Sequence, residues 1–530
     1  MLITIYPRAP PPSCPGLGAL PQLPLHHPAP QRARPLQTPR PSPTFVVPPV
    51  QRLRLRRSKK NSVVLFSPDS PPPSPTASDL PVASDSALAF PRLEVCCATD
   101  PFADILPTGA LGLLTHFASR IGFFEPFEQH FQVPIRCRDY TPLQKLQALI
   151  CSLAVGCEWT KDINHKLRPY PVAAQLLGLQ KFPDQSCINR FLHQLGAPQQ
   201  QQQRECISEQ LLQRFGLWRQ SERVDLDLDS TGLMIYGRHY EGSQKGYFPR
   251  QRGRRGYRLT IASTRHPAGS EILSVCFDPA NVAANGRFWD CLYQATEVLG
   301  SLDRIGLILA DAACGSGPDV QELLEWGPAF MVKGISDKTA IKFAAQVEPA
   351  QWEPLDPRKR VRNRMFTRIC ELGPQHITQC AHPVRVVLVE LMTKRRDRPF
   401  YSHLYTRLSS QQADAETVFH RYNERQCIEA LIKTAKYGLS IKHLRTRSYE
   451  PIENFLHVAA ITFNLLAWFR HYLLAQAGLQ DLGLCELTQT LMDIPAKCSF
   501  RDDQLELQFP ARHPLTPAIS RLSSSAISVI

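Results

Sequence analysis

An alternating run of apolar and acidic residues at positions 224–230 restricts the fold of this chain more than any other stretch. Val-Asp-Leu-Asp-Leu-Asp-Ser has the two-residue period of a β-strand, which places Asp225, Asp227 and Asp229 on one face and the apolar residues on the other. Three like charges on one strand face repel one another. The face is therefore costly unless cations, either a metal ion or arginine side chains, lie against it. A solvated acidic face on an edge strand is the alternative.

A second candidate acid ends a continuous apolar run. Residues 305–310 read Ile-Gly-Leu-Ile-Leu-Ala, which predicts a buried central strand, and Asp311 follows directly, before a loop of small residues at 312–317. The end of a buried strand is a common place for a metal-binding carboxylate. Capping of a helix is the alternative role, although the next predicted helix begins only at Pro318.

A third candidate acid lies on the predicted helix at 422–436. At about 100° per residue, one stripe of this helix collects Tyr422, Arg425, Glu429, Lys433 and Lys436. The opposite side collects Cys427, Ile428, Leu431, Ile432 and Ala435. A single acid flanked by cations and an aromatic hydroxyl suits a metal-binding carboxylate bordered by phosphate contacts. An ordinary amphipathic helix with intrahelical pairs such as Glu429–Lys433 is the alternative.

The charge of the chain indicates a polyanionic partner. The 530 residues carry a net charge of +14 and have a pI near 9.1, which favours nucleic acid first and an acidic membrane surface second. No apolar run reaches the roughly 18–20 residues that span a bilayer, and the best, 455–469, contains His457 and Asn464 and so predicts a buried core helix. The 16 cysteines form no Cys-x-x-Cys pair and are interpreted as reduced intracellular thiols.

A glycine-punctuated loop at 246–258 concentrates positive charge. It contains Arg250, Arg252, Arg254 and Arg255 with aromatic residues between them. Arginines can follow a phosphate backbone, and glycines allow a close approach, so the loop is predicted to contact DNA. A flexible, solvated loop is the alternative.

Changes of composition and period divide the chain. Residues 1–95 are predicted to be a proline-rich disordered leader, because 22 of the 47 prolines fall within the first 91 positions. A helical, DNA-binding domain is expected at 100–220, where the helix at 183–195 would turn Gln185, Ser186, Asn189 and Arg190 towards DNA. A small helical domain without DNA contact is equally compatible with this pattern. The remaining segments are an α/β catalytic core at 221–325 and 410–480, a β-rich insertion at 326–409 and a tail at 481–530.

The spacing of the late helix resembles a known signature. Tyr422, two residues, Arg425, three residues, Glu429, six residues and Lys436 match the Tyr-Arg-Glu-Lys signature of DDE transposases in the insertion-sequence-four superfamily. Asp-Ser-Thr at 229–231, the Gly-Tyr-x-Pro-Arg-x-Arg-Gly loop and Ala-Asp at 310–311 look similar to the insertion-sequence-thirteen-eighty branch. The resemblance covers roughly residues 100–475. Ala312-Ala313-Cys314 departs from the Ser-Gly-Phe or Arg-Gly-Phe that often follows the second aspartate, and Asp227 competes with Asp229 for the first position.

The resemblance implies a ribonuclease-H-like catalytic domain of α/β class with a β-rich insertion, preceded by an α-helical DNA-binding domain. It implies that Asp229, Asp311 and Glu429 hold two Mg²⁺ ions, for which Mn²⁺ can substitute, and that Tyr422, Arg425 and Lys436 hold phosphates. The implied reaction is cleavage at terminal inverted repeats and strand transfer into target DNA. The enzyme would act as a homodimer on double-stranded DNA, in the bacterial cytoplasm at the nucleoid.

Two rival functions use parts of the same pattern. A ribonuclease-H-like nuclease or resolvase would need the carboxylates but not the arginine-rich loop or the helical region. A non-catalytic DNA-binding descendant is the other rival, and acids at all three positions argue against it.

Overall fold

The computed structural model describes residues 2–5, 103–133, 139–195, 198–237, 239–248, 251, 253–283, 285–355, 364–393, 398–501 and 504–522. These residues belong to one compact unit. The leader predicted at 1–95 lies outside the described residues except for 2–5, and so do Arg250 and Arg252 of the predicted DNA-binding loop.

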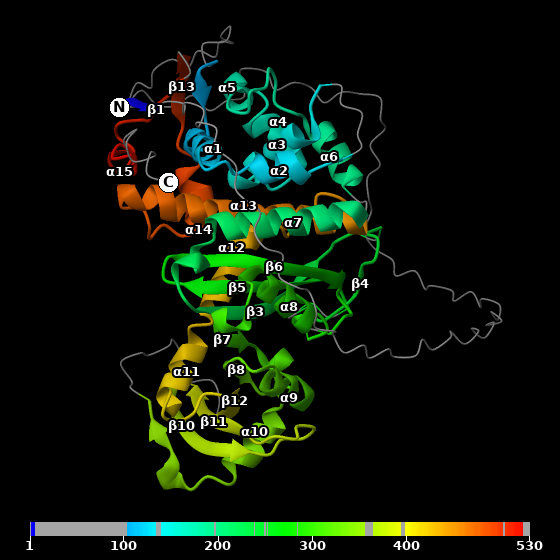
Figure 1. The fold of residues 1–530 in the computed structure, drawn as a ribbon, viewed down its shortest axis with the longest axis vertical. Helices are drawn as coiled ribbons and strands as arrows, with labels where there is room; N and C mark the ends of the chain where they lie inside the picture. The colour runs from blue at the N-terminus through cyan, green and yellow to red at the C-terminus, as the bar shows by residue number, and fades with distance from the viewer. Residues whose placement is uncertain are drawn as a thin grey trace, which may run out of the picture. The chain divides into compact units, whose positions relative to one another are not determined.

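A mixed sheet forms the centre of the unit (Figure 1). Five strands run in the spatial order β6, β5, β3, β7, β8; β3, β5 and β6 pair antiparallel, whereas β7 and β8 pair parallel to β3 and to β7 respectively. Their bounds are β3 Val224–Met234, β5 Arg255–His266, β6 Gly269–Pro279, β7 Ile305–Ala310 and β8 Phe330–Lys333. The predicted α/β class is confirmed, and the predicted strand at 305–310 is central and buried.

The β-rich segment after β8 continues the same sheet. Antiparallel pairing adds β12, β11, β10 and β9 beyond β8, in that order, while the short β4 pairs with β5 at the other end. The bounds are β4 Gln244–Lys245, β9 Glu353–Pro354, β10 Arg364–Gln375, β11 Val384–Thr393 and β12 Phe400–Thr406.

Helices from three parts of the chain surround the sheet (Figure 1). Before it come α1 Ala110–Arg120, α2 Glu125–His130, α3 Pro142–Ala154, α4 Ile163–Lys166, α5 Pro171–Gln175, α6 Gln185–Gln194 and α7 Pro198–Phe215. Between its strands lie α8 Phe288–Leu299, α9 Gly317–Trp326 and α10 Asp337–Ala344. After it come α11 Ala415–Asn423, α12 Gln426–Tyr437, α13 Tyr449–Trp468, α14 Leu484–Glu486 and α15 Thr516–Ile519.

The register of the strands assigns a helix to each face of the sheet. Leu228 pairs with Ala262, which pairs with Ser274, so these three residues share one face. The Ser274 hydroxyl donates to the Cys291 carbonyl at 2.6 Å, which places α8 on this face. The aspartates of β3 therefore point to the opposite face, where α12 packs against β3.

Helix α13 closes the free edge of β6. The side chain of Asn464 accepts from the Ile272 backbone N–H and donates to the Ile272 carbonyl, both at 2.8 Å, and so replaces a neighbouring strand. The helical segment Tyr449–Ala477 is long and apolar enough to cross a membrane, but 83% of its apolar window is buried inside the protein. The prediction of a buried core helix is confirmed.

The N-terminal helices share a core with the sheet. Helices α3, α6 and α7 pack on α13, and one continuous cluster of buried side chains runs from α1 through α6 and α13 to β3. Helix α13 is apolar nearly all round and so buries side chains on both sides. In α6 the predicted inward residues Ile188, Phe191 and Leu192 are fully buried, and Ser186 and Arg190 are exposed.

A small antiparallel sheet includes the first described residues. Strand β1, Leu2–Ile5, pairs with β14, Gln504–Gln508, which pairs with β13, Ala496–Arg501; β2, Ile105–Leu106, follows. Residues 2–5 of the predicted leader thus form a strand, which makes its backbone hydrogen bonds to the edge of β14.

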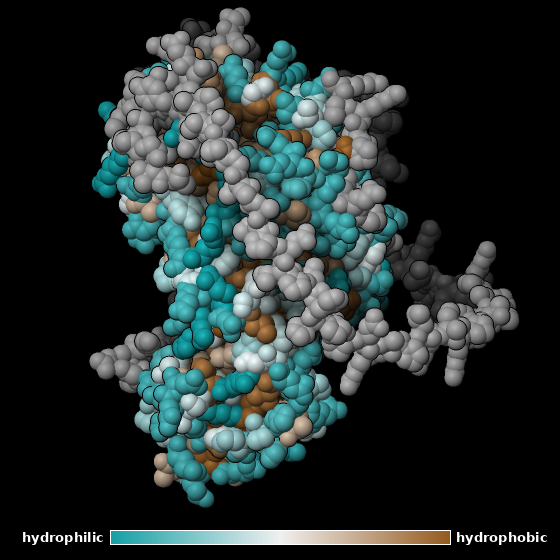
Figure 2. All heavy atoms as spheres, viewed as in Figure 1, coloured by the Kyte–Doolittle hydropathy of each residue, from teal (hydrophilic) through white to brown (hydrophobic). Residues whose placement is uncertain are grey.

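Hydrophilic residues predominate on the face drawn in Figure 2, with hydrophobic residues in scattered groups between them. This is the ordinary surface of a globular protein.

The side chain of Glu271 connects three parts of the protein by hydrogen bonds. Its fully buried carboxylate accepts from the backbone N–H groups of Leu217 and Trp218, at 2.8 and 3.0 Å, and from the indole of Trp468 on α13. Burial raises the pKa of Glu271, and the three donors lower it in part. One side chain of β6 thus holds the segment after α7 and the end of α13.

Replacement of Glu271 by alanine is expected to lower the free energy of unfolding by about 3 kcal/mol or more, because three buried donors lose their acceptor. Urea denaturation monitored by circular dichroism measures this change. Glu297→Ala on the exposed side of α8 is the matched control and should change stability by less than about 0.5 kcal/mol. Equal stabilities of the two variants would contradict the fastening role.

Candidate active site

Two of the predicted acids lie side by side where parallel strands end. Leu228 of β3 is paired with Ala310 of β7, so Asp229 and Asp311 are the next residues on neighbouring parallel strands. Parallel neighbours lie about 4.8 Å apart, which brings both carboxylates to the same edge of the sheet. Burial raises the pKa of Asp229, and the negative charge of Asp311 raises it further.

Asp311 caps a turn and leaves part of its carboxylate free. One carboxylate oxygen accepts from the Ala313 backbone N–H at 2.9 Å and caps a short 3₁₀ turn, Ala312–Cys314. The capping interpretation therefore applies to this turn and not to α9, whose N-cap is Ser316. A carboxylate has two oxygens, so the cap leaves one oxygen of Asp311 at the edge beside Asp229.

The predicted signature helix is broken in the structure. Helix α11 ends at Asn423 and α12 begins at Gln426. The Cys427 and Ile428 N–H groups donate to the carbonyls three residues back, which is the tighter 3₁₀ pattern. The tightening turns Cys427 outwards, so its predicted packing position is wrong, whereas Ile428, Leu431, Ile432 and Ala435 are buried as predicted.

Tyr422 marks the point where the predicted site residues meet. Its hydroxyl donates to the Ala310 carbonyl at 3.3 Å, directly before Asp311. Burial raises the pKa of Tyr422 most; Arg425 lowers it, and the negative charges of Asp311, Asp229 and Glu429 raise it further. The three acids and Arg425 therefore all lie within electrostatic reach of one hydroxyl.

Arg425 points into the protein. Its Nη2 donates to the Leu228 carbonyl at 3.0 Å and lies 3.2 Å from Asp229 Oδ1. The residue is only 8% exposed, and its Nε has no hydrogen-bond partner within the described residues. Burial disfavours the guanidinium charge, but Asp229 and the other nearby acids give a net rise in the pKa of Arg425. In this state Arg425 neutralises a carboxylate and does not face solvent.

Arginines cover the rest of the acidic face of β3. Asp225 Oδ2 lies 2.7 Å from Arg265 Nη2 on β5 and 3.2 Å from Arg421 Nη2 on α11. The cations required by the sequence pattern at this position are therefore side chains of the protein. The sequence did not identify Arg265 and Arg421 as residues of this site. It indicated only that the aspartates of β3 need cations nearby, without showing which element supplies them.

The environments of Asp227 and Asp229 differ. Asp227 is 1% exposed, and its Oδ1 has no hydrogen-bond partner within the described residues. Burial raises the pKa of Asp227 to about 6. Asp229 is partly open and adjoins Asp311. Of the two, Asp229 is the one that adjoins Asp311, and Asp227 is buried within the protein.

Lys436 also reaches the end of β3. Its Nζ donates to the Thr231 hydroxyl at 2.5 Å, two residues from Asp229, and burial lowers the pKa of Lys436. Glu429 and Lys433 are exposed, and the Glu429 carboxylate makes no hydrogen bond or ion pair with another described residue.

The described arginines of the loop behave differently from each other. The Arg255 guanidinium donates to the carbonyl and hydroxyl of Ser243 and so belongs to the base of the loop. Arg254 is exposed and lies 5.7 Å above the ring of Tyr236. Both residues are exposed, but the Arg255 guanidinium is held by Ser243, whereas Arg254 contacts the ring of Tyr236.

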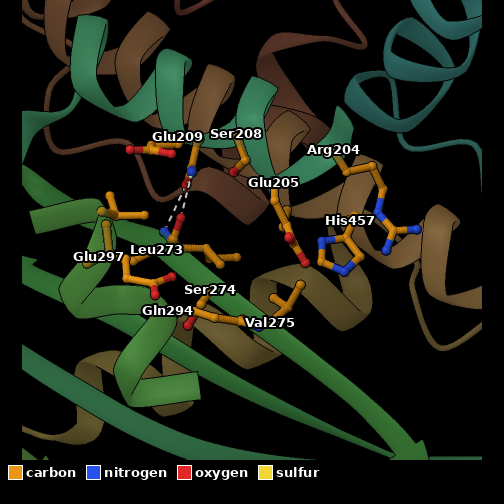
Figure 3. Close-up of a pocket in the computed structure, with 14 residues that line it drawn as sticks. Arg204, Glu205, Ser208, Glu209, Leu273, Ser274, Val275, Gln294, Glu297 and His457 are labelled. Carbon is orange, nitrogen blue, oxygen red and sulfur yellow. Dashed lines mark hydrogen bonds between the residues drawn. The ribbon is translucent and has the colours of Figure 1, made fainter. Parts of the chain in front are cut away.

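A cavity of about 180 Å³ lies away from the acids, between α7, β6, α8 and α13. Figure 3 shows His457 and Arg204 on its wall together with Glu205. None of the predicted site residues lines it.

A family model described as "Transposase DDE domain group 1" matches residues 107–527. This match covers the helical region, the whole sheet and both helices of the signature. The chain belongs to this transposase family. A comparison with curated proteins gave no match.

The match confirms the predicted enzyme class, a transposase acting on DNA. Transposases of the DDE group generally use divalent metal ions. Among the described residues no three His, Cys, Asp or Glu side chains converge on one point that would hold a metal ion. Asp229 and Asp311 nevertheless supply hard oxygen donors at one edge, and the unpartnered Glu429 carboxylate can turn without breaking a bond. Adjacent carboxylates of this kind are the hard oxygen donors that divalent metal ions take in proteins.

Replacement of Arg425 by alanine is expected to destabilise the metal-free transposase by about 3 kcal/mol, because Asp229 would keep a mostly buried charge without its partner. Chemical denaturation in the presence of a chelator measures this loss. Lys433→Ala, on the exposed face of the same helix, is the control and should change stability by less than about 0.5 kcal/mol. An Arg425 variant as stable as this control would show that the guanidinium does not compensate Asp229.

Proposed function

We propose that this chain is a DNA transposase of the insertion-sequence-four superfamily, close to the insertion-sequence-thirteen-eighty branch. It binds the terminal inverted repeats of an insertion sequence, cleaves the ends and transfers the strands to target DNA. The observation that carries this proposal is the adjacency of Asp229 and Asp311 on parallel strands, with Glu429 on the helix packed across them.

The catalytic core is proposed to have a ribonuclease-H-like fold, formed by 221–325 and 410–480. Support comes from the chain order of three antiparallel strands, a helix, the parallel strand β7 and a late helix that carries the third acid. The segment 326–409 is proposed as a β-rich insertion. Its strands β9 to β12 extend the sheet and place the end of β12 shortly before α11.

Asp229, Asp311 and Glu429 would hold two Mg²⁺ ions, which Mn²⁺ can replace. When bound, such ions activate an attacking hydroxyl and stabilise the leaving oxygen of an in-line phosphoryl transfer. The chain's own residues prepare this site. Arg425 offsets the charge of Asp229 and fixes its orientation, and the Tyr422 hydroxyl ties α11 to the end of β7.

The contacts of Tyr422, Arg425 and Lys436 support different roles for these three residues in phosphate binding. Tyr422 and Arg425 donate hydrogen bonds to the carbonyls of Ala310 and Leu228, the residues directly before Asp311 and Asp229. They are therefore proposed to hold these two acids in position. Lys436 keeps donors beyond its bond to Thr231 and is proposed to hold a phosphate beside the site. Arg250, Arg252 and Arg254 are proposed to follow the backbone of the same duplex, with Arg255 stabilising their loop.

The partners proposed are double-stranded DNA, at transposon ends and target, and a second copy of the chain in the DNA complex. The net charge of +14 supports the first. The exposed Ser186 and Arg190 on α6 make this helix the proposed reader within the 100–220 region, whose helices support a DNA-binding role. The proposed location is the bacterial cytoplasm, at the nucleoid.

Replacement of Asp229, Asp311 or Glu429 by alanine is expected to abolish Mg²⁺-dependent cleavage of end DNA, with a loss of at least about 10³-fold, while binding of the uncleaved duplex stays within about threefold. Cleavage is measured on labelled linear DNA that carries the inverted repeats, and binding is measured in Ca²⁺. Cleavage is lost while binding is kept because the three acids act at the scissile phosphate, whereas binding depends on contacts along the whole duplex.

Asp227→Asn is the matched control on the same strand face and should retain cleavage. Full activity of Asp229→Ala with loss in Asp227→Asn would reverse the choice of first ligand. Cleaved ends that are never joined to target DNA would favour the nuclease or resolvase, and DNA binding without any metal-dependent cleavage by the wild type would favour the non-catalytic descendant.

Lys436→Ala is expected to reduce the slope of log affinity against log salt by about one unit, because one phosphate contact is lost. Titration of an end-containing duplex at several salt concentrations measures the slope. Lys497→Ala is the control, since Lys497 pairs with Asp104 in the small sheet at 3.0 Å. Unchanged slopes for both variants would remove Lys436 from the DNA interface.

A further inference from the structure

One arginine near the acids carries its charge without a partner. Arg258 of β5 is partly buried, and its Nε is buried without a hydrogen-bond partner. Within the part of the chain that the structure describes, its guanidinium makes no hydrogen bond and no ion pair. Withdrawing a guanidinium from water costs free energy unless an anion lies against it, and arginine does not lose its charge in a protein. Such a side chain indicates a binding site for an anion.

The register of the strands places Arg258 at the end of the sheet where the acids lie. Arg258 is paired with Gly232 of β3, which follows Asp229 by three residues, or about 10 Å of strand. Burial lowers the pKa of Arg258, and the negative charges of Asp311 and Asp278 raise it in part. The guanidinium therefore lies within electrostatic reach of Asp311, one of the two adjacent site acids.

The acid opposite Arg258 is already paired with another cation. Asp278 of β6 is the cross-strand partner of Arg258, but its carboxylate accepts from the Nε of Arg287 at 3.3 Å. Arg287 lies directly before α8 and also pairs with Asp290, at 2.7 Å. Asp278 therefore does not neutralise Arg258, and the charge of Arg258 remains available for a ligand.

On two sides the neighbours of Arg258 are glycines covered by an aromatic ring. Gly232 is its cross-strand partner on β3, and Gly256 lies two residues before it on β5, so both share its face of the sheet. The ring of Phe248 lies over both positions, since a Cβ added to either glycine would meet the ring at 2.7 Å. The ring offers the guanidinium no hydrogen-bond acceptor, so these two sides do not supply the missing anion.

Arg258 and Glu429 approach the end of β3 from opposite faces of the sheet. Residues that alternate along β6 share one face, so Asp278 and its partner Arg258 lie on the face of Ser274, which α8 covers. Helix α12, which carries Glu429, packs on the other face. A group bound at the carboxylate edge would therefore have Arg258 on one side and Glu429 on the other.

The chemistry of the edge selects a phosphodiester as the anion. In the proposed function, the group that meets the acids is the phosphate at the cleavage point. A guanidinium binds phosphate through two parallel N–H donors. During transfer the phosphoryl group spreads negative charge over its non-bridging oxygens, and a fixed cation at those oxygens lowers the barrier.

We propose that Arg258 is a catalytic residue that binds the phosphate at the cleavage point. The proposal deepens the proposed function and rests on it, because it takes the DNA end as the substrate. The guanidinium donates to the non-bridging oxygens and forms no covalent bond. In the step that it stabilises, the oxygen of the attacking water bonds to phosphorus and the water loses a proton. The 3′ oxygen leaves with the electron pair of its bond and takes up a proton.

Single-turnover kinetics of the full chain on a labelled duplex that carries one inverted repeat measure this role. With Mg²⁺ present and the protein in excess, Arg258→Gln is expected to cleave at least about 10²-fold more slowly than the wild type, while duplex affinity in Ca²⁺ falls by less than about fivefold. Arg258→Lys keeps the charge but loses the fork, and it should cleave at least about tenfold faster than Arg258→Gln. Arg304→Gln is the matched control, because Arg304 is a partly buried arginine at the other end of the sheet, directly before β7, and it should cleave as the wild type does.

A neutral linkage tests the contact independently of cleavage. A methylphosphonate at the cleavage point removes the charge of that phosphate, and its effect on affinity in Ca²⁺ is compared for the wild type and Arg258→Gln. The methylphosphonate is expected to weaken the wild type at least about threefold more than the variant, because the variant has already lost the contact. At a linkage about five base pairs away, both proteins should weaken equally.

The catalytic role is overturned if Arg258→Gln cleaves as fast as the wild type, or if the methylphosphonate at the cleavage point weakens both proteins equally. A purely structural role would lower the melting temperature and the duplex affinity of Arg258→Gln together, and this result would also overturn the proposal. Failure of the wild type to cleave the duplex in Mg²⁺ would instead overturn the proposed function.

Discussion

The compensation of the acidic face of β3 by arginines is the interaction on which the site depends. Three carboxylates on one face repel each other, and the protein places Arg265 and Arg421 at Asp225 and Arg425 at Asp229. Two of these arginines come from α11 and from the turn before α12. The ion pairs between these arginines and the aspartates of β3 therefore hold α11 and the start of α12 against the sheet. The position of Glu429 on α12 follows from this packing.

The same interaction explains the irregular course of the late helices. A regular helix through 422–436 would keep Arg425 on the stripe of Glu429 and Lys433, which is exposed. The 3₁₀ turn at Glu424 and Arg425 instead directs the guanidinium to Leu228 and Asp229. The gain is a charge-assisted contact in a buried position, where an unpaired carboxylate would be costly.

The N-terminal helices share one continuous cluster of buried side chains with the central sheet, and a second cluster lies between β7, β8, β10, β11, β12 and α11. Helix α13 seals the edge of β6 through Asn464 and receives the N-terminal helices on its other sides. A DNA end held by the helical region would consequently be fixed relative to the acids. Both proposed DNA-contacting parts, α6 and the loop carrying Arg254, belong to this one compact unit.

The sequence by itself determined the local features of this protein. The two-residue period at 224–230, the apolar run at 305–310 and the buried side of α12 depend only on which residues alternate, and all three are present in the structure. The adjacency of Asp229 and Asp311 also followed from the resemblance to a family, which the family match supports.

Only the tertiary structure decided which polar groups face inwards. The burial of Arg425, the choice between Asp227 and Asp229 and the partnership of Asp225 with Arg265 and Arg421 depend on residues up to about 200 positions apart in the chain. The periodicity of a sequence does not show which of several polar residues on one face is buried. The free energy of burying each residue depends on its desolvation and on partners that another element supplies.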